Sequence, residues 1–429
     1  GPAPPTLVDT IGVQDGDTLV FLGDSITHQR LYTQYVEDFF YTRFPQRRIR
    51  FHNAGIGGAR AWDALQRVNR DVLDYKPRYV TILLGMNDGS YRTFDTATFN
   101  TYQNDMLELV ERLKQGGAIP ILMSPTMYDA RAAMARPNAR AADMQSQYNA
   151  VLAFYGKWLQ HEAIENGYGF VDMFGPLNAL TIEQRKTNPT FTLIRDAVHP
   201  DAPGQLVMAY SIIDNMGLRS NVSAIRGTLM PNGKLRVGGT KGKVENVNQT
   251  ETQLEFDWTA EALPWVLPEE AREGAALLKL GHRASSESLE IHGLPTGTYE
   301  LSIDGTVVGR YSTAQLERHI ELQENEKTPQ YQQALQVAML NKKKNEGPVN
   351  ELRRAWVTFQ GWARDTRSLA ANPDNQELAK KVANAAERLT SLEETIARVE
   401  AEARTIEDEI YQVNQPVCRH YRLTRVDAP

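Results

Sequence analysis

The feature that most constrains this chain is the alternation, in its first half, of short β-rich apolar runs with amphipathic segments. Five runs are strand candidates, and each is followed by turn residues and a helical stretch: Thr18–Leu22, Arg48–His52, Tyr79–Leu84, Ile119–Ser124 and Gly169–Asp172. This pattern predicts a parallel sheet covered by helices on both faces. The first half is therefore expected to be an α/β domain, with any ligand site beyond the carboxyl ends of the strands.

From about Ser223 the pattern changes to short alternating strands broken by Gly, Pro and Asn, which is typical of a small β-sandwich. Gly297–Tyr311 carries the hairpin signal Asp304-Gly305. A further strand is expected at Arg419–Val426, after a helical segment, so the helices are expected to be inserted within the β-domain.

The helical segment starts at Thr328-Pro329, and Gly347-Pro348 is expected to stop its first helix. A second helix is expected at Val349–Leu369. The third has apolar residues at alternating spacings of four and three, as in a coiled-coil seam: Leu378, Val382, Ala385, Leu389, Leu392, Ile396, Val399, Ala403, Ile406 and Ile410. We expect this seam to pack on the second helix as an antiparallel hairpin, and self-association through it is the competing interpretation. The expected domains are 1–221, 222–327 with 416–429, and 328–415.

Four polar blocks follow the predicted strands or close the α/β domain. Gly23-Asp24-Ser25 follows the first strand; the others are Asn53-Ala54-Gly55-Ile56-Gly57-Gly58, Gly85-Met86-Asn87-Asp88 and Asp196-Ala197-Val198-His199-Pro200. A single Gly-Asp-Ser triplet is weak evidence, but four blocks in this order resemble the signature blocks of the SGNH (GDSL-like) hydrolase superfamily. The resemblance covers about residues 16–217. It implies a flavodoxin-like three-layer α/β/α fold and a serine esterase.

The blocks contain the groups that acyl transfer requires, which are a nucleophile, a base, a group that orients the base, and oxyanion donors. Ser25 is the predicted nucleophile, His199 its general base, and Asp196 the group that fixes the imidazole tautomer. By resemblance, the oxyanion hole comprises the backbone N–H groups of Ser25 and Gly58 and the side-chain amide of Asn87.

Further residues beside these blocks are candidates for substrate binding: Asp24, His28, Arg60, Trp62, Met86 and Tyr128. For two of them a structural role is an open alternative, since His28 can face solvent and Trp62 can anchor the following helix. Asp88 is expected to form an Asx-turn without touching substrate. The loop Ser124–Asp143 is either a wall of the pocket or a plain surface excursion.

Composition excludes several classes of protein. The formal net charge of −6 argues against a nucleic-acid partner, and no stretch of about 18 apolar residues predicts a membrane span. One cysteine and eight histidines without His-x-His or HExxH spacing predict neither a metal site nor a cofactor. The opening Gly-Pro resembles what remains after cleavage of a tag, and GPAPPT has no signal-peptide pattern. With a signal peptide taken as removed, we expect a periplasmic or secreted protein.

The substrate is indicated only loosely. Gly293–Tyr311 through Gln330–Leu340 resembles the C-terminal portion of SGNH-like proteins from polysaccharide-degrading bacteria, which implies removal of acetyl groups from a carbohydrate. A lipase or thioesterase acting on longer acyl chains is the alternative within the enzyme class. A non-catalytic carbohydrate-binding or scaffold protein is the alternative outside it.

Overall fold

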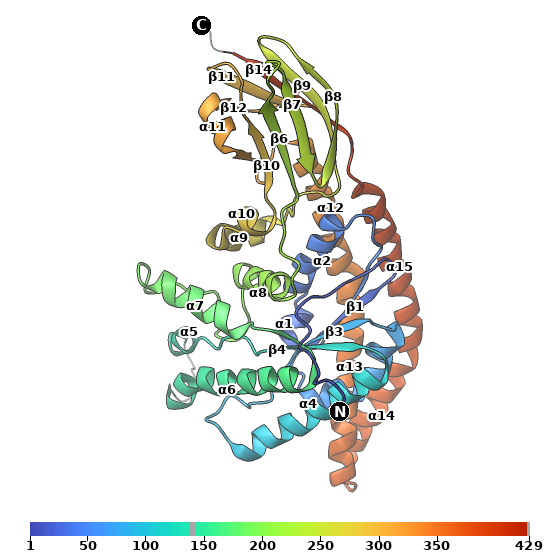
Figure 1. The fold of residues 1–429 in the computed structure, drawn as a ribbon. Helices are drawn as coiled ribbons and strands as arrows, with labels where there is room; N and C mark the ends of the chain where they lie inside the picture. The colour runs from blue at the N-terminus through green and yellow to red at the C-terminus, as the bar shows by residue number, and fades with distance from the viewer. Residues whose placement is uncertain (137–141, 427–429) are drawn as a thin grey trace. The chain divides into compact units, whose positions relative to one another are not determined.

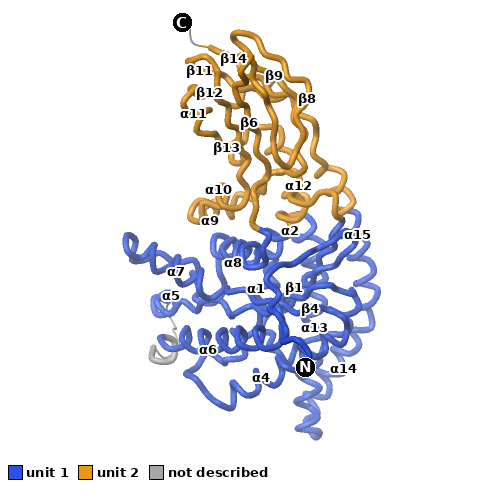
Figure 2. The backbone as a smooth tube through the Cα atoms, viewed as in Figure 1, with its two compact units in different colours: residues 1–36, 48–218, 343–405 blue, residues 37–47, 219–342, 406–429 orange. Residues whose placement is uncertain are grey.

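The computed structural model describes residues 1–136 and 142–426, and residues 137–141 and 427–429 lie outside the described part. The chain divides into two compact units, coloured separately in Figure 2. The first unit comprises residues 1–36, 48–218 and 343–405, and the second comprises residues 37–47, 219–342 and 406–429. Residues 343–405 of the predicted helical segment therefore belong to the same unit as the parallel sheet.

A five-stranded parallel sheet is the centre of the first unit. Its strands are β1 (Thr18–Gly23), β2 (Arg50–Gly55), β3 (Tyr79–Leu83), β4 (Ile119–Met123) and β5 (Gly169–Val171). They lie in the order β2-β1-β3-β4-β5, and every neighbouring pair is parallel. The five predicted strands are confirmed with ends shifted by at most three residues, because buried β-rich runs have few other ways to satisfy their backbone groups.

Helices cover both faces of this sheet. They are α1 (Ser25–His28), α2 (Tyr32–Arg43), α3 (Ala61–Asp71), α4 (Thr96–Gln115), α5 (Ala130–Met134), α6 (Ala142–Asn166), α7 (Phe174–Arg185) and α8 (Ala202–Asn215), with a 3₁₀ turn at Leu73–Tyr75. Val20 and Leu22 of β1 join a core with residues of α3, α4 and α6. Phe21 points to the opposite face and packs edge-on against Tyr32. The α/β architecture with an additional β-domain is thus confirmed (Figure 1).

The helical segment runs through α12 (Pro329–Lys344), a π-helical turn (Asn345–Val349), α13 (Asn350–Ala371), α14 (Gln376–Arg388), a 3₁₀ turn (Leu389–Ser391) and α15 (Leu392–Val413). The prediction that Gly347-Pro348 stops the first helix is wrong. The wider π-helical turn contains Pro348, and helical geometry continues directly into α13. A π-turn shifts the hydrogen-bond pattern by one residue, so a residue without an N–H is tolerated there.

The predicted apolar seam faces inward. Each seam residue is at least partly buried, and Ile396 and Val399 of α15 join the core that contains Leu352 and Trp356 of α13. An ion pair between Arg398 and Glu351 connects the same two helices at the surface. The centre of the seam is therefore covered within the first unit, and self-association through the seam stays a prediction.

The second unit contains two sheets that enclose an apolar core. The first has the order β13-β10-β6-β7 and the second the order β12-β11-β14-β9-β8. The strands are β6 (Ser223–Leu229), β7 (Leu235–Thr240), β8 (Gly242–Gln249), β9 (Gln253–Ala260), β10 (Glu287–Ile291), β11 (Thr298–Ile303), β12 (Thr306–Ser312), β13 (Ile320–Glu321) and β14 (Arg419–Arg425). Short helices join them: a 3₁₀ turn (Glu269–Ala271), α9 (Arg272–Leu278), α10 (Leu280–Ala284) and α11 (Thr313–Arg318).

Two local predictions for this unit are confirmed. Asp304 and Gly305 both have positive φ, 51° and 81°, and they join β11 to β12 as a tight hairpin. The last strand, β14, pairs antiparallel with both β9 and β11. Because β14 follows the helices in the chain, the helical segment interrupts the sequence of the β-domain.

Buried Glu287 of β10 is expected to make the stability of the second unit dependent on pH. Burial raises the pKa of Glu287 from 4.5 to about 7, although Gln330 donates a hydrogen bond to it at 3.3 Å. A pKa that is higher in the folded state contributes stability below pH 4.5, and this contribution is lost as pH rises to about 7. The wild type should lose about 3 kcal/mol over this window.

The Glu287→Gln variant should lack this loss, because glutamine is neutral at every pH. Thermal unfolding measures this difference. At pH 5 the wild type and the variant should have similar midpoints, and at pH 8 the variant should have the higher midpoint. A difference between the two proteins that does not change with pH would contradict the proposed cause.

Candidate functional site

Four loops at one edge of the parallel sheet carry the residues singled out in the sequence. Ser25 is the first residue of α1 directly after β1, Gly58 follows β2, and Asn87 follows β3. His199 lies in the loop that precedes α8. Because β2, β1 and β3 are parallel neighbours, their carboxyl ends meet at the same edge.

Ser25, His199 and Asp196 form a continuous chain of hydrogen bonds. The Ser25 Oγ lies 2.8 Å from His199 Nε2, and His199 Nδ1 lies 2.7 Å from Asp196 Oδ2. Both distances are within hydrogen-bond range, and each imidazole nitrogen has one partner. Ser25 and His199 are 174 positions apart in the chain, so this contact is produced by the fold alone.

Asp196 is held in a tight turn by its own neighbours. Its Oδ1 accepts the backbone N–H groups of Val198 at 3.0 Å and of His199 at 2.7 Å. Burial favours the neutral acid, but these N–H groups and the His199 ring together lower the pKa of Asp196 below its ordinary value. The carboxylate is therefore ionised at neutral pH and can hold a proton on His199 Nδ1.

The turn that carries Ser25 is capped by the residue before it. Asp24 is 1% exposed, and its carboxylate accepts the N–H of Ile26 at 3.0 Å as the N-cap of α1. Burial raises the pKa of Asp24 to about 6. Asp24, a sequence candidate for substrate binding, is thus placed beneath the serine.

His28, at the end of α1, contacts the loop that follows β2. Burial, together with the positive charges of Arg353 and Arg30, lowers the pKa of His28 to about 4, so the ring is neutral at pH 7. Its Nδ1 accepts the N–H of Gly57 at 3.2 Å. A Cβ at Gly55 would lie 2.4 Å from the backbone nitrogen of His28, so this close approach of loop and helix requires glycine.

Two donors predicted for an oxyanion hole lie on neighbouring loops. Gly58 is exposed and has a φ of +73°, and none of the described hydrogen bonds uses its N–H. The Asn87 side chain donates one N–H to the carbonyl of Ala59 at 3.1 Å, and its Oδ1 accepts the hydroxyl of Tyr91 at 3.1 Å. Asn87 is therefore oriented from both ends of its amide, which leaves its second N–H for another acceptor.

The remaining candidates divide into exposed and buried positions. Arg60 is exposed at the start of α3, and Trp62 is half-buried with the guanidinium carbon of Arg367 3.6 Å from the ring centre. Met86 and Tyr128 are only 2% and 5% exposed. Arg60 and Trp62 are thus the candidates at the surface, whereas Met86 and Tyr128 belong to the walls beneath it.

Asp88 has a structural role, but its side chain makes no described hydrogen bond of the expected Asx-turn. Its Oδ1 accepts the N–H of Ala61 at 2.9 Å, which ties the loop after β3 to the start of α3. Burial raises the pKa of Asp88 to about 7. In the loop expected from Ser124 to Asp143, a short helix, α5, occupies Ala130–Met134, and residues 137–141 lie outside the described part.

Sequence reasoning missed residues that reach the loop after β2 from α13. Gln360 donates to the carbonyl of Gly57 at 2.8 Å, and Arg364 donates to the carbonyl of Gly58 at 2.7 Å. Arg364 also forms a two-pronged ion pair with Asp63, with both distances at 2.8 Å. No local pattern marks these residues, because they follow the loop by about 300 positions.

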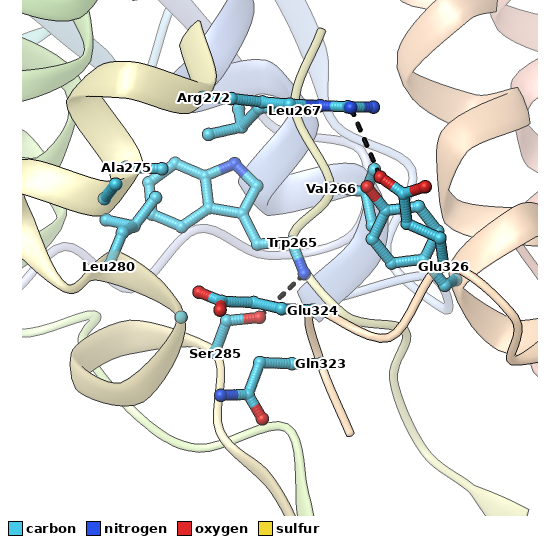
Figure 3. Close-up of a pocket in the computed structure, with 13 residues that line it drawn as sticks. Trp265, Val266, Leu267, Arg272, Ala275, Leu280, Ser285, Gln323, Glu324 and Glu326 are labelled. Carbon is cyan, nitrogen blue, oxygen red and sulfur yellow. Dashed lines mark hydrogen bonds and ion pairs between the residues drawn. The ribbon is translucent and has the colours of Figure 1, made fainter. Parts of the chain in front are cut away.

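A separate pocket of about 250 Å³ lies in the second unit and is drawn in Figure 3. The indole of Trp265 forms one wall, and an ion pair between Arg272 and Glu326 lies at another. The backbone N–H of Trp265 donates to Ser285 Oγ at 2.8 Å. None of the predicted site residues lines this pocket, since all of them belong to the first unit.

No group of three or more His, Cys, Asp or Glu side chains is arranged to hold a metal ion among residues 1–136 and 142–426. Within the same ranges, no helix combines the length and apolar character needed to cross a membrane.

Comparison with known proteins relates the first part of the chain to acylhydrolases. Residues 21–207 match the model of the GDSL-like lipase/acylhydrolase family. An acetylxylan esterase of Geobacillus stearothermophilus is 27% identical over 227 residues, which cover 48% of this chain and 96% of the relative. The uncharacterized lipoprotein YqeF of Bacillus subtilis (strain 168) is 29% identical over 138 residues, which cover 29% of this chain and 57% of the relative.

A solved structure extends the likeness to both units. It is described as a gut microbial diltiazem-metabolizing enzyme and aligns with a TM-score of 0.83 at 25% identity, over 97% of this chain and 99% of its own. The parallel sheet and the match over residues 21–207 make this part of the chain similar to GDSL-like acylhydrolases. The protein is a carboxylic ester hydrolase.

Proposed function

We propose that this esterase works through Ser25 as nucleophile, His199 as general base and Asp196 as the group that orients the base. The observation that carries this proposal is the 2.8 Å contact between Ser25 Oγ and His199 Nε2. His199 takes the serine proton as Ser25 attacks the ester carbonyl, and returns a proton to the leaving alcohol. Water then hydrolyses the acyl-enzyme by the same two steps in the second half of the reaction.

The negative charge that develops on the carbonyl oxygen needs donors that are already in place. We assign this role to the backbone N–H groups of Ser25 and Gly58 and to the free N–H of Asn87. Asn87 is held by Ala59 and Tyr91, so the donor requires little reorganisation when the charge appears. Each such donor contributes about 3 kcal/mol to transition-state stabilisation.

The proposed substrate is an acetyl ester of a carbohydrate. Support comes from the acetylxylan esterase relative, since the alignment with this chain spans 96% of that relative. Half-buried Trp62 offers an aromatic ring, and exposed Arg60 offers hydrogen-bond donors, beside the loop after β2. Both groups suit a sugar. Diltiazem, which the structural neighbour is described as metabolizing, carries an acetate ester on a ring and is therefore a second acetate ester to test.

The test is hydrolysis of p-nitrophenyl acetate, butyrate and octanoate by the full chain, together with acetate release from acetylated xylan and from diltiazem. Activity confined to the acetate esters is expected, and Ser25→Ala should abolish it. Preference for octanoate would replace the deacetylase by a lipase or thioesterase. Turnover that does not depend on Ser25 would refute the proposed nucleophile.

We also propose a location outside the cytoplasm. A carbohydrate polymer is a substrate of the cell exterior or envelope, and one relative is described as a lipoprotein. Fractionation of cells that express the natural gene should recover the esterase in the envelope or the medium, and recovery with cytosolic markers would contradict this.

A further inference from the structure

Helix α13 lies outside the residues that match the family model, yet its side chains reach the proposed oxyanion hole. Three residues of α13 donate hydrogen bonds to carbonyls of the segment Gly55–Gly58, which we call the glycine loop. Arg353 Nη1 bonds the carbonyl of Gly55 at 3.4 Å, Gln360 that of Gly57 at 2.8 Å, and Arg364 that of Gly58 at 2.7 Å. The spacings of seven and four residues put all three on one face of the helix.

The bond from Gln360 acts directly on the proposed donor. The carbonyl of Gly57 and the N–H of Gly58 belong to the same peptide unit, which is planar and trans, so the two groups point in opposite directions. When Gln360 holds the carbonyl, it also sets the direction of the N–H. Gln360 is 7% exposed, so little room is left for its amide to move.

The bond from Arg364 acts on the next peptide unit. The carbonyl of Gly58 is held by a guanidinium that is itself fixed by Asp63 through Nε and Nη2. Asp63, in the first turn of α3, is 4% exposed and also accepts the N–H of Arg60 at 2.8 Å. Arg364 is thus a bridge between the glycine loop and the helix that follows it.

The glycine loop needs such support from outside. Gly57 and Gly58 have no side chains, and Gly58 adopts a φ of +73°, so rotation of their shared peptide meets little steric resistance. Apart from α13, two described bonds lie next to this peptide: the Gly57 N–H donates to His28, and the Ala59 N–H donates to the carbonyl of Ile56 at 3.2 Å. The second bond closes a turn with the two glycines at its centre, and such a turn accepts either orientation of its central peptide. The two bonds from α13 lie on both sides of Gly58 and select one orientation.

We propose that Gln360 and Arg364 are positioning residues of the esterase, which hold the Gly57–Gly58 peptide so that the Gly58 N–H stabilises the oxyanion. This inference rests on the proposed function, because it takes Gly58 as an oxyanion donor. The helical segment thereby takes part in catalysis without touching the substrate.

The experiment measures kcat and KM of the full chain on p-nitrophenyl acetate for Gln360→Ala, Arg364→Ala and Arg364→Lys. The two alanine variants should each lose kcat about 10- to 100-fold, with KM changed less than about threefold, because the oxyanion exists only in the transition state. Arg364→Lys retains one charged donor and should recover part of the loss. Binding of phenylboronic acid, which forms a tetrahedral adduct with a serine, should weaken in parallel with kcat/KM.

The matched control is Arg70→Ala. Arg70 of α3 forms a two-pronged ion pair with Glu393 of α15, at 2.8 and 2.9 Å, and so also joins α3 to the helical segment, but it does not contact the glycine loop. Its kcat should equal that of the wild type. An equal loss in this control would mean that general loosening of the helices is the cause, and would overturn the inference.

Ser25→Ala separates this inference from the proposed function. If Ser25→Ala is inactive while Gln360→Ala and Arg364→Ala are fully active, the positioning role is rejected and the proposed triad stands. Active Ser25→Ala would reject the proposed function itself. If Arg364→Ala fails to fold, as judged by thermal unfolding, the uncharged substitution Gln360→Ala decides alone.

Discussion

Replacement of His199 by alanine is expected to lower kcat on p-nitrophenyl acetate by at least about 10⁴-fold. Without the imidazole, Ser25 has no base within hydrogen-bond range, since His199 Nε2 at 2.8 Å is the described partner of its hydroxyl. The alcohol of serine is a weak nucleophile unless its proton is removed during attack. KM should change little, because the imidazole contributes to the transition state and not to binding of a small ester.

The double variant Ser25→Ala/His199→Ala should be no slower than the slower single variant, because residues that act as a unit are not additive. The control is His161→Ala, which removes an exposed histidine of α6 and should retain wild-type kcat. If His199→Ala kept activity within tenfold of the wild type, another group would have to be the base.

Replacement of Asp71 by alanine is expected to destabilise the first unit by about 3–5 kcal/mol, because it leaves buried positive charge without a partner. Asp71 is fully buried at the end of α3. It bonds Arg67 at 2.7 Å, Arg353 at 2.6 and 2.9 Å, and His52 at 2.9 Å. Arg67 and Arg353 are also inaccessible to solvent, so neither guanidinium can be hydrated after the substitution.

Calorimetry should show a fall of about 10 °C in the midpoint of thermal unfolding of the first unit. Glu393→Ala is the matched control, since it breaks an exposed ion pair with Arg70 and should cost less than about 1 kcal/mol. Equal shifts in the two variants would show that the buried cluster contributes no more than a surface pair.

The Asp71 effect should also depend on pH. Burial opposes ionisation of Asp71, but the charge of Arg353 and the hydrogen bonds from His52 and Arg353 outweigh it and hold the pKa of Asp71 well below 3.8. A folded-state pKa below the unfolded value contributes stability that is present at higher pH and lost as pH falls below about 4. Wild type and Asp71→Ala should therefore converge in midpoint under acid conditions.

Much of the α/β domain and its site was predictable because the determining interactions are local or periodic. Buried β-rich runs separated by helical stretches admit one arrangement, a parallel sheet, and place Ser25, Gly58 and Asn87 at one edge. The pair Asp196 and His199 lies within a single turn, so its contact follows from spacing alone. The seam of the last helices was visible for the same reason, since helical periodicity marks the face that becomes buried.

The Gly347-Pro348 error has a different origin. Proline usually ends a helix because it lacks an N–H and clashes with the preceding turn. Here the wider π-turn accommodates Pro348, and the helix continues into the first half of α13, where Leu352, Arg353 and Trp356 are buried. Local propensity was overridden by tertiary packing.

By itself the sequence determined the class of fold, the order of the four blocks that carry the proposed site residues, and the inward face of the helices, because each depends on residues a few positions apart. Only the tertiary structure decided which distant groups support the site. Gln360 and Arg364 meet the glycine loop, and Arg353 meets Asp71, across some 300 residues of chain. Such contacts have no periodicity and no fixed spacing, since they depend on how α13 packs against α3 and β2.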